Sequence, residues 1–420
     1  MSADHPAVAV VGLGYTGLPL AVAFAATGCR VIGVEIDHAR LGRLTDGHST
    51  VEDVSDDDLR AAAPRLELVP DIDEARDADA IILCVPTPLS ANREPDLTAL
   101  TQAGSTVGRV LRAGQLVVLQ STTYPGTTRE VLVPALEAGG MRAGADFNVA
   151  YSPERVDPGR TDHTMRTTPK VVGGLTDACR ERARDLYALV CDEIVEVSSP
   201  EAAELSKLLE NIFRSVNIAL VNELAILCDR MAIDIREVVD AAATKPYGFM
   251  RFDPGPGMGG HCLPVDPFYL AWKAREYDLS VEFIELAGKV NQHMPYYCVE
   301  RVERALNDAG KPVRGSRIVL LGVSYKRNVG DLRESPALKI GALLRGLGAE
   351  LAYHDPHVPV LDELALRSEA LPEALDGADL AVIVTDHAAV DHGAIVDSGT
   401  LVLDLRGALG TREAPNLIAL

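Results

Sequence analysis

The sequence lacks any block of five or six Lys or Arg residues, and its 40 basic residues are outnumbered by 61 acidic ones. The formal net charge is therefore −21, with a pI near 4.9. Such a charge disfavours nonspecific attraction to nucleic acid or to an anionic membrane surface. We therefore predict neither nucleic acid nor a membrane as a partner. Any anionic ligand must be bound by positively charged or N–H groups that the fold brings together at one site.

Cysteine pairs at redox or metal spacing are also lacking. The seven cysteines are an odd number and widely spread, without a CxxC pair or a Cys/His cluster at the spacing of zinc ligands. Disulfide frameworks belong mainly to oxidising compartments. The sequence therefore predicts a reduced, cytoplasmic chain without a metal site.

Charge is absent from residues 6–29, a stretch long enough to imitate a signal peptide or a membrane span. Three glycines and a proline interrupt it, however, and the residues before it include Asp4 but no Lys or Arg. We interpret this stretch as a strand, a turn and a helix of a soluble domain.

The length of 420 residues and an apolar content of 47% suit two or three globular domains. Short β-branched runs alternate with helical patterns, and strands are predicted at residues 7–11, 30–34, 80–85, 115–119 and 148–151. One long helix is predicted from residue 200 to residue 228. A helix of this length usually bridges domains or forms a dimer seam.

The alternation of the first half returns near the carboxyl end. RIVLLG and GAELAYHD at 317–355 parallel VAVVGLG and GCRVIGVE at 8–35, whereas the glycine fingerprint is not repeated. The predicted fold is α/β, with Rossmann-like doubly wound domains at 1–199 and 313–420 joined by a helical middle domain at 200–312. Only the first domain is expected to bind a dinucleotide.

A GxGxxG sequence, residues 12–17, lies between a predicted strand and a predicted helix. Glycines at this spacing allow a tight turn and close approach of a pyrophosphate, whose charge the helix N-terminus favours. Glu35 ends the next strand, where a carboxylate binds an adenosine ribose and repels a 2′-phosphate. The pattern predicts NAD in preference to NADP; the alternative is an ordinary turn with a chance acid.

Further loops follow predicted strands at 85–88 (VPTP) and 120–126 (QSTTYPG). Because ligands bind at the carboxyl edge of open α/β sheets, these loops are either the floor beneath a nicotinamide or scaffold. Glu154 follows another strand, in SPERVDPG at 152–159. Its carboxylate is suited to steer a water toward a thioester, unless the segment is a surface turn.

Lys207 and Asn211 stand four residues apart in the long predicted helix and so share one face. Glu204 and Glu210 lie nearby, which suits a solvated, salt-bridged face. The apolar residues around the pair, such as Leu208, suit a partly buried face turned toward a ligand instead.

A segment rich in Gly and Pro leads from Asp253 to His261, Cys262 and, four residues later, Asp266. A cysteine thiolate is suited to capture an aldehyde as a thiohemiacetal and to leave from the thioester that follows. Taken alone, Cys262 also suits a buried structural role. His261 is assigned no catalytic role because adjacent side chains usually point apart.

In this order the segments resemble the nucleotide-sugar 6-dehydrogenase family, which includes UDP-glucose and UDP-N-acetylhexosamine dehydrogenases. The resemblance spans residues 7–407 and rests on the motifs GLGYTGLP, CVPTP, STTYPGTT, SPERVDPG, AELSKLLENIFRSVNIALVNE, PGPGMGGHCLPVDP, LGVSYKRNVGDLRESP and VLDLRG. It implies oxidation of the C6 alcohol of a UDP-sugar through an aldehyde to a carboxylate, with two NAD consumed. It also implies a homodimer built through the long helix.

The resemblance implies catalytic roles for Cys262, Lys207, Asn211, Asp266, Glu154 and Thr122. The cysteine is the nucleophile, the lysine stabilises oxyanionic intermediates, and the asparagine positions sugar and water. The aspartate helps to manage protons, the glutamate acts on the water that hydrolyses the thioester, and the threonine helps to hold that water.

Two sets of binding residues are implied as well. The cofactor contacts are Gly12, Gly14, Tyr15, Thr16, Gly17, Glu35, Arg40, Pro86, Thr87, Thr122 and Arg333. The substrate contacts are Glu154, Arg155, Lys207, Asn211, Arg251, Phe252, Gly257, Gly260, Tyr325, Lys326 and Arg406. We expect the few basic residues among them to collect the positive field that a chain of charge −21 otherwise lacks.

Pro246 stands where UDP-glucose dehydrogenases often have an arginine from the neighbouring subunit. This departure and the variants SPERVDPG, AAATKPYGFM and NQHMP resemble the N-acetylhexosamine branch. UDP-N-acetyl-D-glucosamine is the predicted substrate, with UDP-N-acetyl-D-mannosamine, UDP-glucose and GDP-mannose as alternatives. Two other classes stay open: a two-electron β-hydroxyacid-type dehydrogenase, which needs neither the cysteine nor a second Rossmann-like half, and a catalytically silent nucleotide-binding protein.

Overall fold

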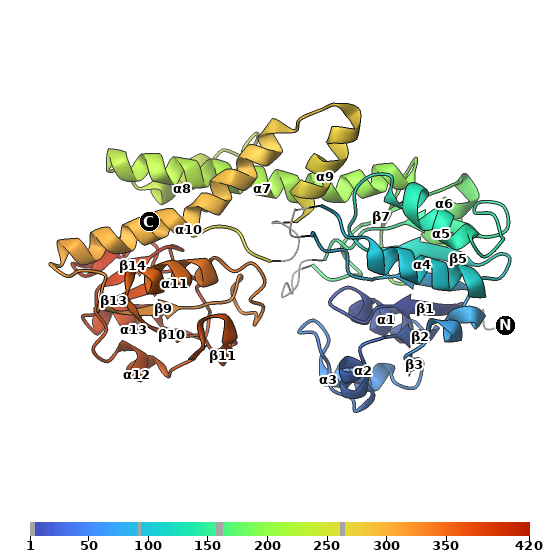
Figure 1. Ribbon diagram of the computed structural model, residues 1–420, viewed down its shortest axis with the longest axis horizontal. Coiled ribbons are helices and arrows are strands. Elements are labelled where there is room, and N and C mark those ends of the chain that lie inside the picture. The colour runs from blue at the N-terminus through green and yellow to red at the C-terminus, as the bar shows by residue number, and fades with distance from the viewer. Residues whose placement is uncertain (1–4, 91–93, 157–162, 261–264) are drawn as a thin grey trace. The chain divides into compact units, whose positions relative to one another are not determined.

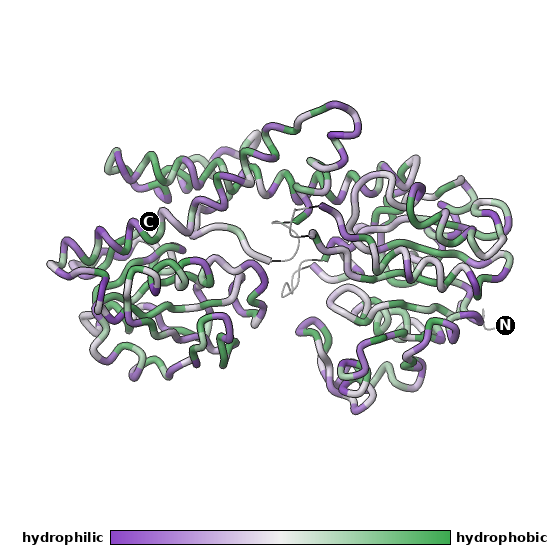
Figure 2. Tube along the Cα trace, in the orientation of Figure 1, coloured by the Kyte–Doolittle hydropathy of each residue, from purple (hydrophilic) through white to green (hydrophobic). Residues whose placement is uncertain are grey.

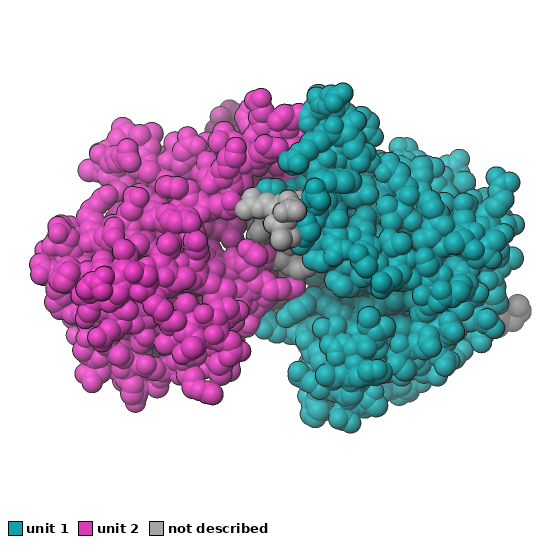
Figure 3. All heavy atoms as spheres, in the orientation of Figure 1, with its two compact units in different colours: residues 1–210, 268–279 teal, residues 211–267, 280–420 magenta. Residues whose placement is uncertain are grey.

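The computed structural model describes residues 5–90, 94–156, 163–260 and 265–420. The chain divides into two compact units (Figures 1 and 3). Unit 1 comprises residues 1–210 and 268–279, and unit 2 comprises residues 211–267 and 280–420. Cys262 and His261 lie outside the described residues, so the structure adds nothing to the predictions made for them.

Unit 1 is built on an eight-stranded sheet with the order β3-β2-β1-β4-β5-β6-β7-β8. The strands are β1 (Ala7–Val11), β2 (Arg30–Val34), β3 (Leu66–Val69), β4 (Ala80–Leu83), β5 (Leu116–Leu119), β6 (Asn148–Tyr151), β7 (Lys170–Gly174) and β8 (Ile194–Val197). All neighbours are parallel except β6 and β7, which are antiparallel. The five predicted strands are confirmed, while β3, β7 and β8 are additional.

Helices cover both faces of this sheet, because successive residues of its strands are apolar, as their colour in Figure 2 indicates. Val8 and Val10 of β1 belong to one buried cluster, and Ala9 and Val11 belong to another. The first cluster includes residues of α1 (Gly17–Ala26), α3 (Asp56–Ala62) and α6 (Asp177–Tyr187), and the second includes residues of α4 (Thr98–Val110) and α5 (Val133–Glu137). The doubly wound α/β arrangement predicted for this part is confirmed.

The long helix α7 (Pro200–Met231) ends three residues beyond its predicted end, where Ala232 turns to a φ of 55°. Further helices of the middle region are α8 (Ile235–Ala243), α9 (Asp266–Ala274) and α10 (Glu282–Asp308). Among the described helices, α7 alone is long and apolar enough to cross a membrane, but a buried core helix would satisfy the same two criteria. Within its most apolar window, 44% is buried.

Unit 2 contains a parallel sheet with the order β10-β9-β13-β14-β15. Its strands are β9 (Arg317–Leu321), β10 (Glu350–His354), β13 (Leu380–Ile383), β14 (Val402–Asp404) and β15 (Leu417–Ala419), with α11 (Pro336–Leu347), α12 (Leu371–Leu375) and α13 (His392–Asp397) as helices. The order β10-β9-β13-β14 repeats β2-β1-β4-β5 of unit 1. The internal repeat inferred from the sequence is therefore present in the strand order.

Candidate active site

The glycine-rich turn joins β1 to α1 in unit 1. Gly12 has a φ of +92°, and a Cβ on Gly17 would lie 1.8 Å from the carbonyl oxygen of Gly12. A Cβ on Gly14 would meet no heavy atom of the described residues within 4 Å. The turn therefore needs Gly12 and Gly17 for its own geometry, whereas the space above Gly14 is left for a ligand that approaches the backbone.

The N-terminus of α1 is suited to a phosphate. Within the described part of the chain, the side chain of its N-cap residue, Thr16, makes no capping hydrogen bond. Uncapped N–H groups and the helix dipole favour an anion at such a terminus. Together with the open space at Gly14, this arrangement fits the pyrophosphate of a dinucleotide.

Glu35 lies just past the end of β2 and is almost fully buried. Its Oε2 atom accepts hydrogen bonds from Leu13 N at 3.1 Å and from Arg40 Nη1 at 3.0 Å, and its Oε1 atom accepts one from Asp37 N at 2.9 Å. The Glu35 carboxylate thus fixes the glycine-rich turn through Leu13. It also fixes the side chain of Arg40, a predicted cofactor contact.

The loops after β4 and β5 are bonded to each other. The Thr87 hydroxyl donates to the carbonyl oxygen of Thr122 at 2.7 Å, and the Ser121 hydroxyl donates to that of Val85 at 2.6 Å. Tyr269 of α9 donates its hydroxyl to the carbonyl oxygen of Thr87. The structure therefore brings the predicted cofactor contacts Thr87 and Thr122 together at the carboxyl edge of the sheet.

Glu154 follows β6 at the same edge, with its side chain 18% exposed. Its Oε2 atom accepts from Gln120 Nε2 at 2.9 Å and from Lys170 Nζ at 3.2 Å. Burial acts to raise the pKa of this carboxyl, but the Lys170 ammonium and the Val156 N–H outweigh it, with Lys207 and the Arg155 N–H adding to them, so the pKa lies below its usual value. Glu154 is therefore an anion at neutral pH.

Lys207 is half-buried on α7, and the acidic residues near it have different surroundings. Glu204 is fully buried and accepts hydrogen bonds from Gly126 N at 2.6 Å and Thr128 N at 2.8 Å, while Glu210 pairs with Arg155 at 2.7 Å. Burial raises the pKa of Glu204 to about 7. The solvated-face alternative is thus wrong for Glu204, which anchors the loop after β5 to the helix that carries Lys207.

In unit 2 the structure brings Asn211 and Asp266 together. Both are buried, and the Asn211 amide donates to the Asp266 carboxylate. The chain before Cys262 is also fixed, because Gly260 N donates to the carbonyl oxygen of Arg333 at 2.8 Å. A Cβ on Gly260 would lie 2.8 Å from the ring of Tyr325. Two predicted substrate contacts, Gly260 and Tyr325, therefore pack against each other.

The predicted arginine contacts of unit 2 are paired with carboxylates. Arg251 contacts Asp253 at 2.9 Å, and it also contacts Asp240. Arg333 pairs with Asp331, and Arg406 approaches Asp386 at 3.7 Å. Each of these arginines thus lies next to an acid, and Asp386 is shared by Arg406 and Arg327. That the basic residues of the site supply a positive field for the substrate stays a prediction.

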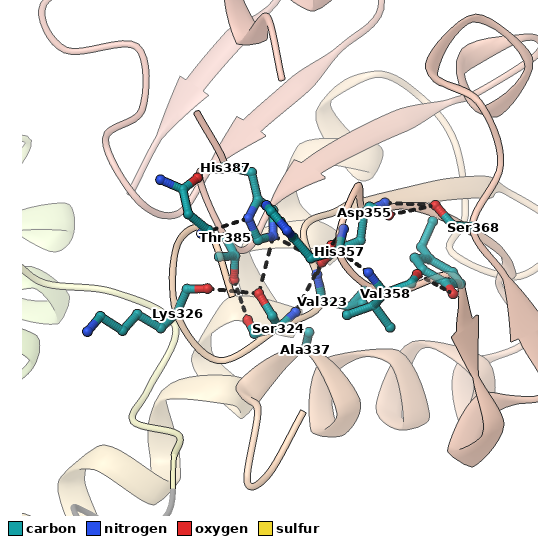
Figure 4. Close-up of polar contacts among 12 residues, drawn as sticks. Val323, Ser324, Lys326, Ala337, Asp355, His357, Val358, Ser368, Thr385 and His387 are labelled. Carbon is teal, nitrogen blue, oxygen red and sulfur yellow. Dashed lines mark hydrogen bonds and ion pairs between the residues drawn. The ribbon is translucent and has the colours of Figure 1, made fainter. Parts of the chain in front are cut away.

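Figure 4 shows the polar network behind the loop that carries Lys326. His387 Nε2 lies 3.2 Å from Ser324 Oγ and 3.0 Å from Asp355 Oδ2, while its Nδ1 accepts from Asn328 N at 3.0 Å. A nucleophilic triad would place serine and aspartate on different nitrogens of the imidazole. This buried cluster is therefore a brace for the loop after β9.

The turn after β9 has the same bonds as the turn after β1. Gly322, at a φ of +75°, donates to the carbonyl oxygen of His354 at 2.9 Å, as Gly12 does to that of Val34 at 2.8 Å. Val323 N donates to Asp355 Oδ2 at 2.7 Å, as Leu13 N does to Glu35. The helix that follows differs: α11 is capped by the side chain of Ser335, which accepts from Ala337 N.

No group of three or more His, Cys, Asp or Glu residues in the described ranges is arranged to hold a metal ion. The six cysteines that the structure describes are free thiols. Burial raises the pKa of Cys84, next to the glycine-rich turn, to about 12, so this thiol is not a thiolate at neutral pH.

Three family models match consecutive parts of the chain. They describe the NAD binding domain, the central domain and the UDP binding domain of the UDP-glucose/GDP-mannose dehydrogenase family, at residues 6–191, 201–293 and 319–411. The chain belongs to the UDP-glucose/GDP-mannose dehydrogenase family. The predicted family, fold class and NAD cofactor are thereby confirmed, and the protein is an NAD-dependent oxidoreductase of nucleotide sugars.

Members of the UDP-glucose/GDP-mannose dehydrogenase family with different substrates are similar to this chain. The UDP-N-acetyl-D-glucosamine 6-dehydrogenase of Pseudomonas aeruginosa is 38% identical over 89% of this chain and 90% of its own. The solved UDP-D-ManNAc dehydrogenase of Pyrococcus horikoshii is 33% identical, with a TM-score of 0.89 over 98% of both chains. A solved UDP-glucose dehydrogenase of Pyrobaculum islandicum, 29% identical, also has a TM-score of 0.89, over 99% of this chain and 98% of its own.

Two residues of this site are missing from the sequence-based set. Lys170 contacts Glu154 only because β7 runs antiparallel to β6, and nothing in the local sequence indicates the direction of a strand. Glu204 is buried by its hydrogen bonds to Gly126 and Thr128, residues far from it in the sequence, so no local pattern indicates its role.

Proposed function

We propose that the protein oxidises the C6 alcohol of UDP-N-acetyl-D-glucosamine to the uronic acid in two successive two-electron steps. The observation that carries the four-electron reaction is Glu154, a partly buried carboxylate at the same sheet edge as the NAD turn. A dehydrogenase that stops at a carbonyl product needs no group to act on a hydrolytic water. The substrate is inferred from the motifs of the N-acetylhexosamine branch and from the Pseudomonas relative.

The residues divide the reaction between them. NAD, when bound, accepts one hydride in each step. The C6 alcohol loses a hydride and a proton to give the aldehyde, whose developing oxyanion Lys207 stabilises. The Cys262 thiolate adds to the aldehyde carbon, and loss of the second hydride from the thiohemiacetal gives a thioester. Water then adds to the thioester under the influence of Glu154, and the thiolate leaves as the carboxylate forms.

UDP-N-acetyl-D-mannosamine is the second candidate substrate, because it is named for the solved Pyrococcus enzyme, which is 33% identical to this chain. The test is to supply NAD with each of UDP-GlcNAc, UDP-ManNAc, UDP-glucose and GDP-mannose in turn. We expect the highest kcat/KM with UDP-GlcNAc and two NADH for each sugar consumed. One NADH per sugar would contradict the four-electron reaction, and thermal stabilisation without turnover would indicate a silent nucleotide-binding protein.

We infer that two copies of the chain associate through α7. Within unit 2, Leu220, Leu224, Leu227 and Met231 recur at spacings of three and four residues, and their exposed fractions lie between 38% and 57%. Such spacing forms one apolar stripe on a helix. A stripe of this kind is costly to leave in water, and a second α7 offers the matching surface.

Changing Leu220 and Leu227 together to glutamate is therefore expected to produce a monomer of 44.8 kDa. Two charges in the stripe would have to be buried unpaired in the dimer. Light scattering after size exclusion measures the mass. Arg214→Gln is the control, because Arg214 is exposed and lies six residues before Leu220, about 120° around the helix from it and so outside the stripe. A dimer that survives the double change would refute the α7 interface.

A further inference from the structure

Lys170 contacts Glu154 because its strand, β7, runs antiparallel to β6. In unit 1, β6 and β7 pair with Ala150 opposite Gly174 and Tyr151 opposite Gly173. Continuing this register beyond β6 sets Glu154 opposite Lys170. Residues that are opposite in an antiparallel pair place their side chains on the same face of the sheet, close enough to interact. The first residue of β7 therefore lies at the edge where β1, β4, β5 and β6 end.

Four protein donors occupy the carboxylate of Glu154. Gln120 and Lys170 donate to Oε2, and the backbone N–H groups of Arg155 and Val156 donate to Oε1, each at 2.8 Å. These described donors hold the carboxylate of Glu154 in one orientation, while its side chain keeps an exposed fraction of 18%.

Lys170 and Gln120 are themselves held. The Lys170 side chain is only 4% exposed, and its ammonium lies 5.2 Å from the centre of the Tyr187 ring. The Tyr187 hydroxyl donates to Gln120 Oε1 at 2.7 Å, which turns the amide nitrogen of Gln120 toward Glu154. Lys170 and Gln120 thus belong to a buried polar network with Glu154 and Tyr187, in which loss of one member removes a partner of the others.

The other titratable groups around Glu154 come from several elements. Cys84 follows β4, Tyr187 ends α6 and Cys191 follows that helix; burial raises the pKa of each, so all three are neutral at neutral pH. The Arg155 guanidinium is paired with Glu210, and Lys207 of α7 acts on Glu154 without a hydrogen bond between them among the described contacts. Among the described residues, Lys170 is therefore the cation in direct contact with this carboxylate.

We propose that Lys170 is a positioning residue for the hydrolytic step, which holds Glu154 ionised and in one orientation and thereby sets the pH range in which the thioester is hydrolysed. This inference rests on the proposed four-electron function. Without the ammonium, the largest contribution that opposes burial is lost, so we expect the pKa of Glu154 to rise; fully buried Asp and Glu side chains shift upward by as much as about 3–5 pH units. A protonated Glu154 has lost the charge that acts on the water.

The experiment compares Lys170→Met, which keeps the buried stem, with Lys170→Arg, which keeps the charge. Rapid-quench single turnovers with UDP-GlcNAc and NAD separate the first NADH from uronate release. In Lys170→Met we expect the first NADH at the normal rate, and uronate release at least about tenfold slower at pH 6, recovering as the pH rises. Lys170→Arg is expected to restore the release rate at pH 6.

Lys273→Met is the matched control, because Lys273 is another buried lysine of unit 1 that pairs with acids, here Glu130 and Glu276. Its loss is expected to leave the pH profile of uronate release in place. Release that falls equally at all pH values, or that Lys170→Arg does not restore, would overturn the positioning role and indicate a structural one.

A second measurement keeps this inference separate from the proposed function. Carbon-13 NMR of carboxyl-labelled protein follows the titration of Glu154, with Glu154→Gln identifying its resonance. We expect the titration to move to higher pH in Lys170→Met by at least about 2.5 pH units, the shift that a tenfold loss of the ionised carboxylate at pH 6 requires. An unchanged titration would refute the role of Lys170 even in an active enzyme. Failure of every nucleotide sugar to yield two NADH would instead refute the proposed function.

Discussion

Replacing Cys262 by serine is expected to lower the rate of uronate formation by about 10³-fold or more, with NAD affinity unchanged. The serine hydroxyl is far less acidic than a thiol, and an alkoxide leaves an ester less readily than a thiolate leaves a thioester. The first oxidation does not need the sulfur. At most one equivalent of NADH per active site is therefore expected in a rapid burst.

Uronate measured by chromatography, together with burst kinetics and NAD titration, tests this result. Cys84→Ser is the control, because Cys84 lies beside the glycine-rich turn but its raised pKa keeps it a neutral thiol. That variant is expected to form uronate at the normal rate. Undiminished uronate formation in Cys262→Ser would show that the oxidation proceeds without this nucleophile.

Gly17→Ala is expected to lower NAD affinity by about 100-fold or more and to destabilise the fold of unit 1. Its Cβ would lie 1.8 Å from the Gly12 carbonyl oxygen, so β1 and α1 would have to move apart. Gly14→Ala has a different expected result. Its Cβ meets none of the described atoms within 4 Å, so the protein folds normally, but a methyl group there blocks the approach of the pyrophosphate.

Calorimetric titration with NAD and thermal unfolding separate the two variants. For Gly14→Ala we expect an unchanged Tm and an NAD affinity lowered about tenfold or more, equivalent to about 1.4 kcal/mol. Gly346→Ala on α11 is the control, an exposed helical glycine that is likewise free of described neighbours and has no ligand role. Normal NAD binding by Gly14→Ala would contradict the assignment of this turn to the pyrophosphate.

The elements recovered from sequence are those set by local patterns. β1, β2 and β6 have the predicted bounds because apolar, β-branched runs end at glycine or polar residues, and α7 continues only three residues past its predicted end. The missed strands lack a long apolar run: β8 reads IVEV and is partly exposed, and β7 reads KVVGG, with only two β-branched residues. Their place in the sheet is decided by pairing partners, which no local window contains.

The candidate site divides in the same way. The glycine turn and Glu35 could be predicted because the chemistry and the spacing lie within one strand–turn–helix unit. Lys170 could not, because its contact with Glu154 needs a strand reversal. The pairing of Arg251 with Asp240 and of Arg406 with Asp386 likewise depends on chain segments that meet only in the fold.

An acid follows β2 in unit 1, Glu35, and the corresponding strand β10 in unit 2, Asp355. Both acids tie a glycine turn to its neighbouring strand, although only the first half has a dinucleotide fingerprint. The acid thus has the same structural role in both halves: it stabilises the turn whether or not a dinucleotide fingerprint is present. The two halves differ at the N-terminus of the helix that follows the turn. The Ser335 side chain accepts a hydrogen bond from the first turn of α11, whereas the N–H groups at the start of α1 have no such side-chain cap and suit a phosphate.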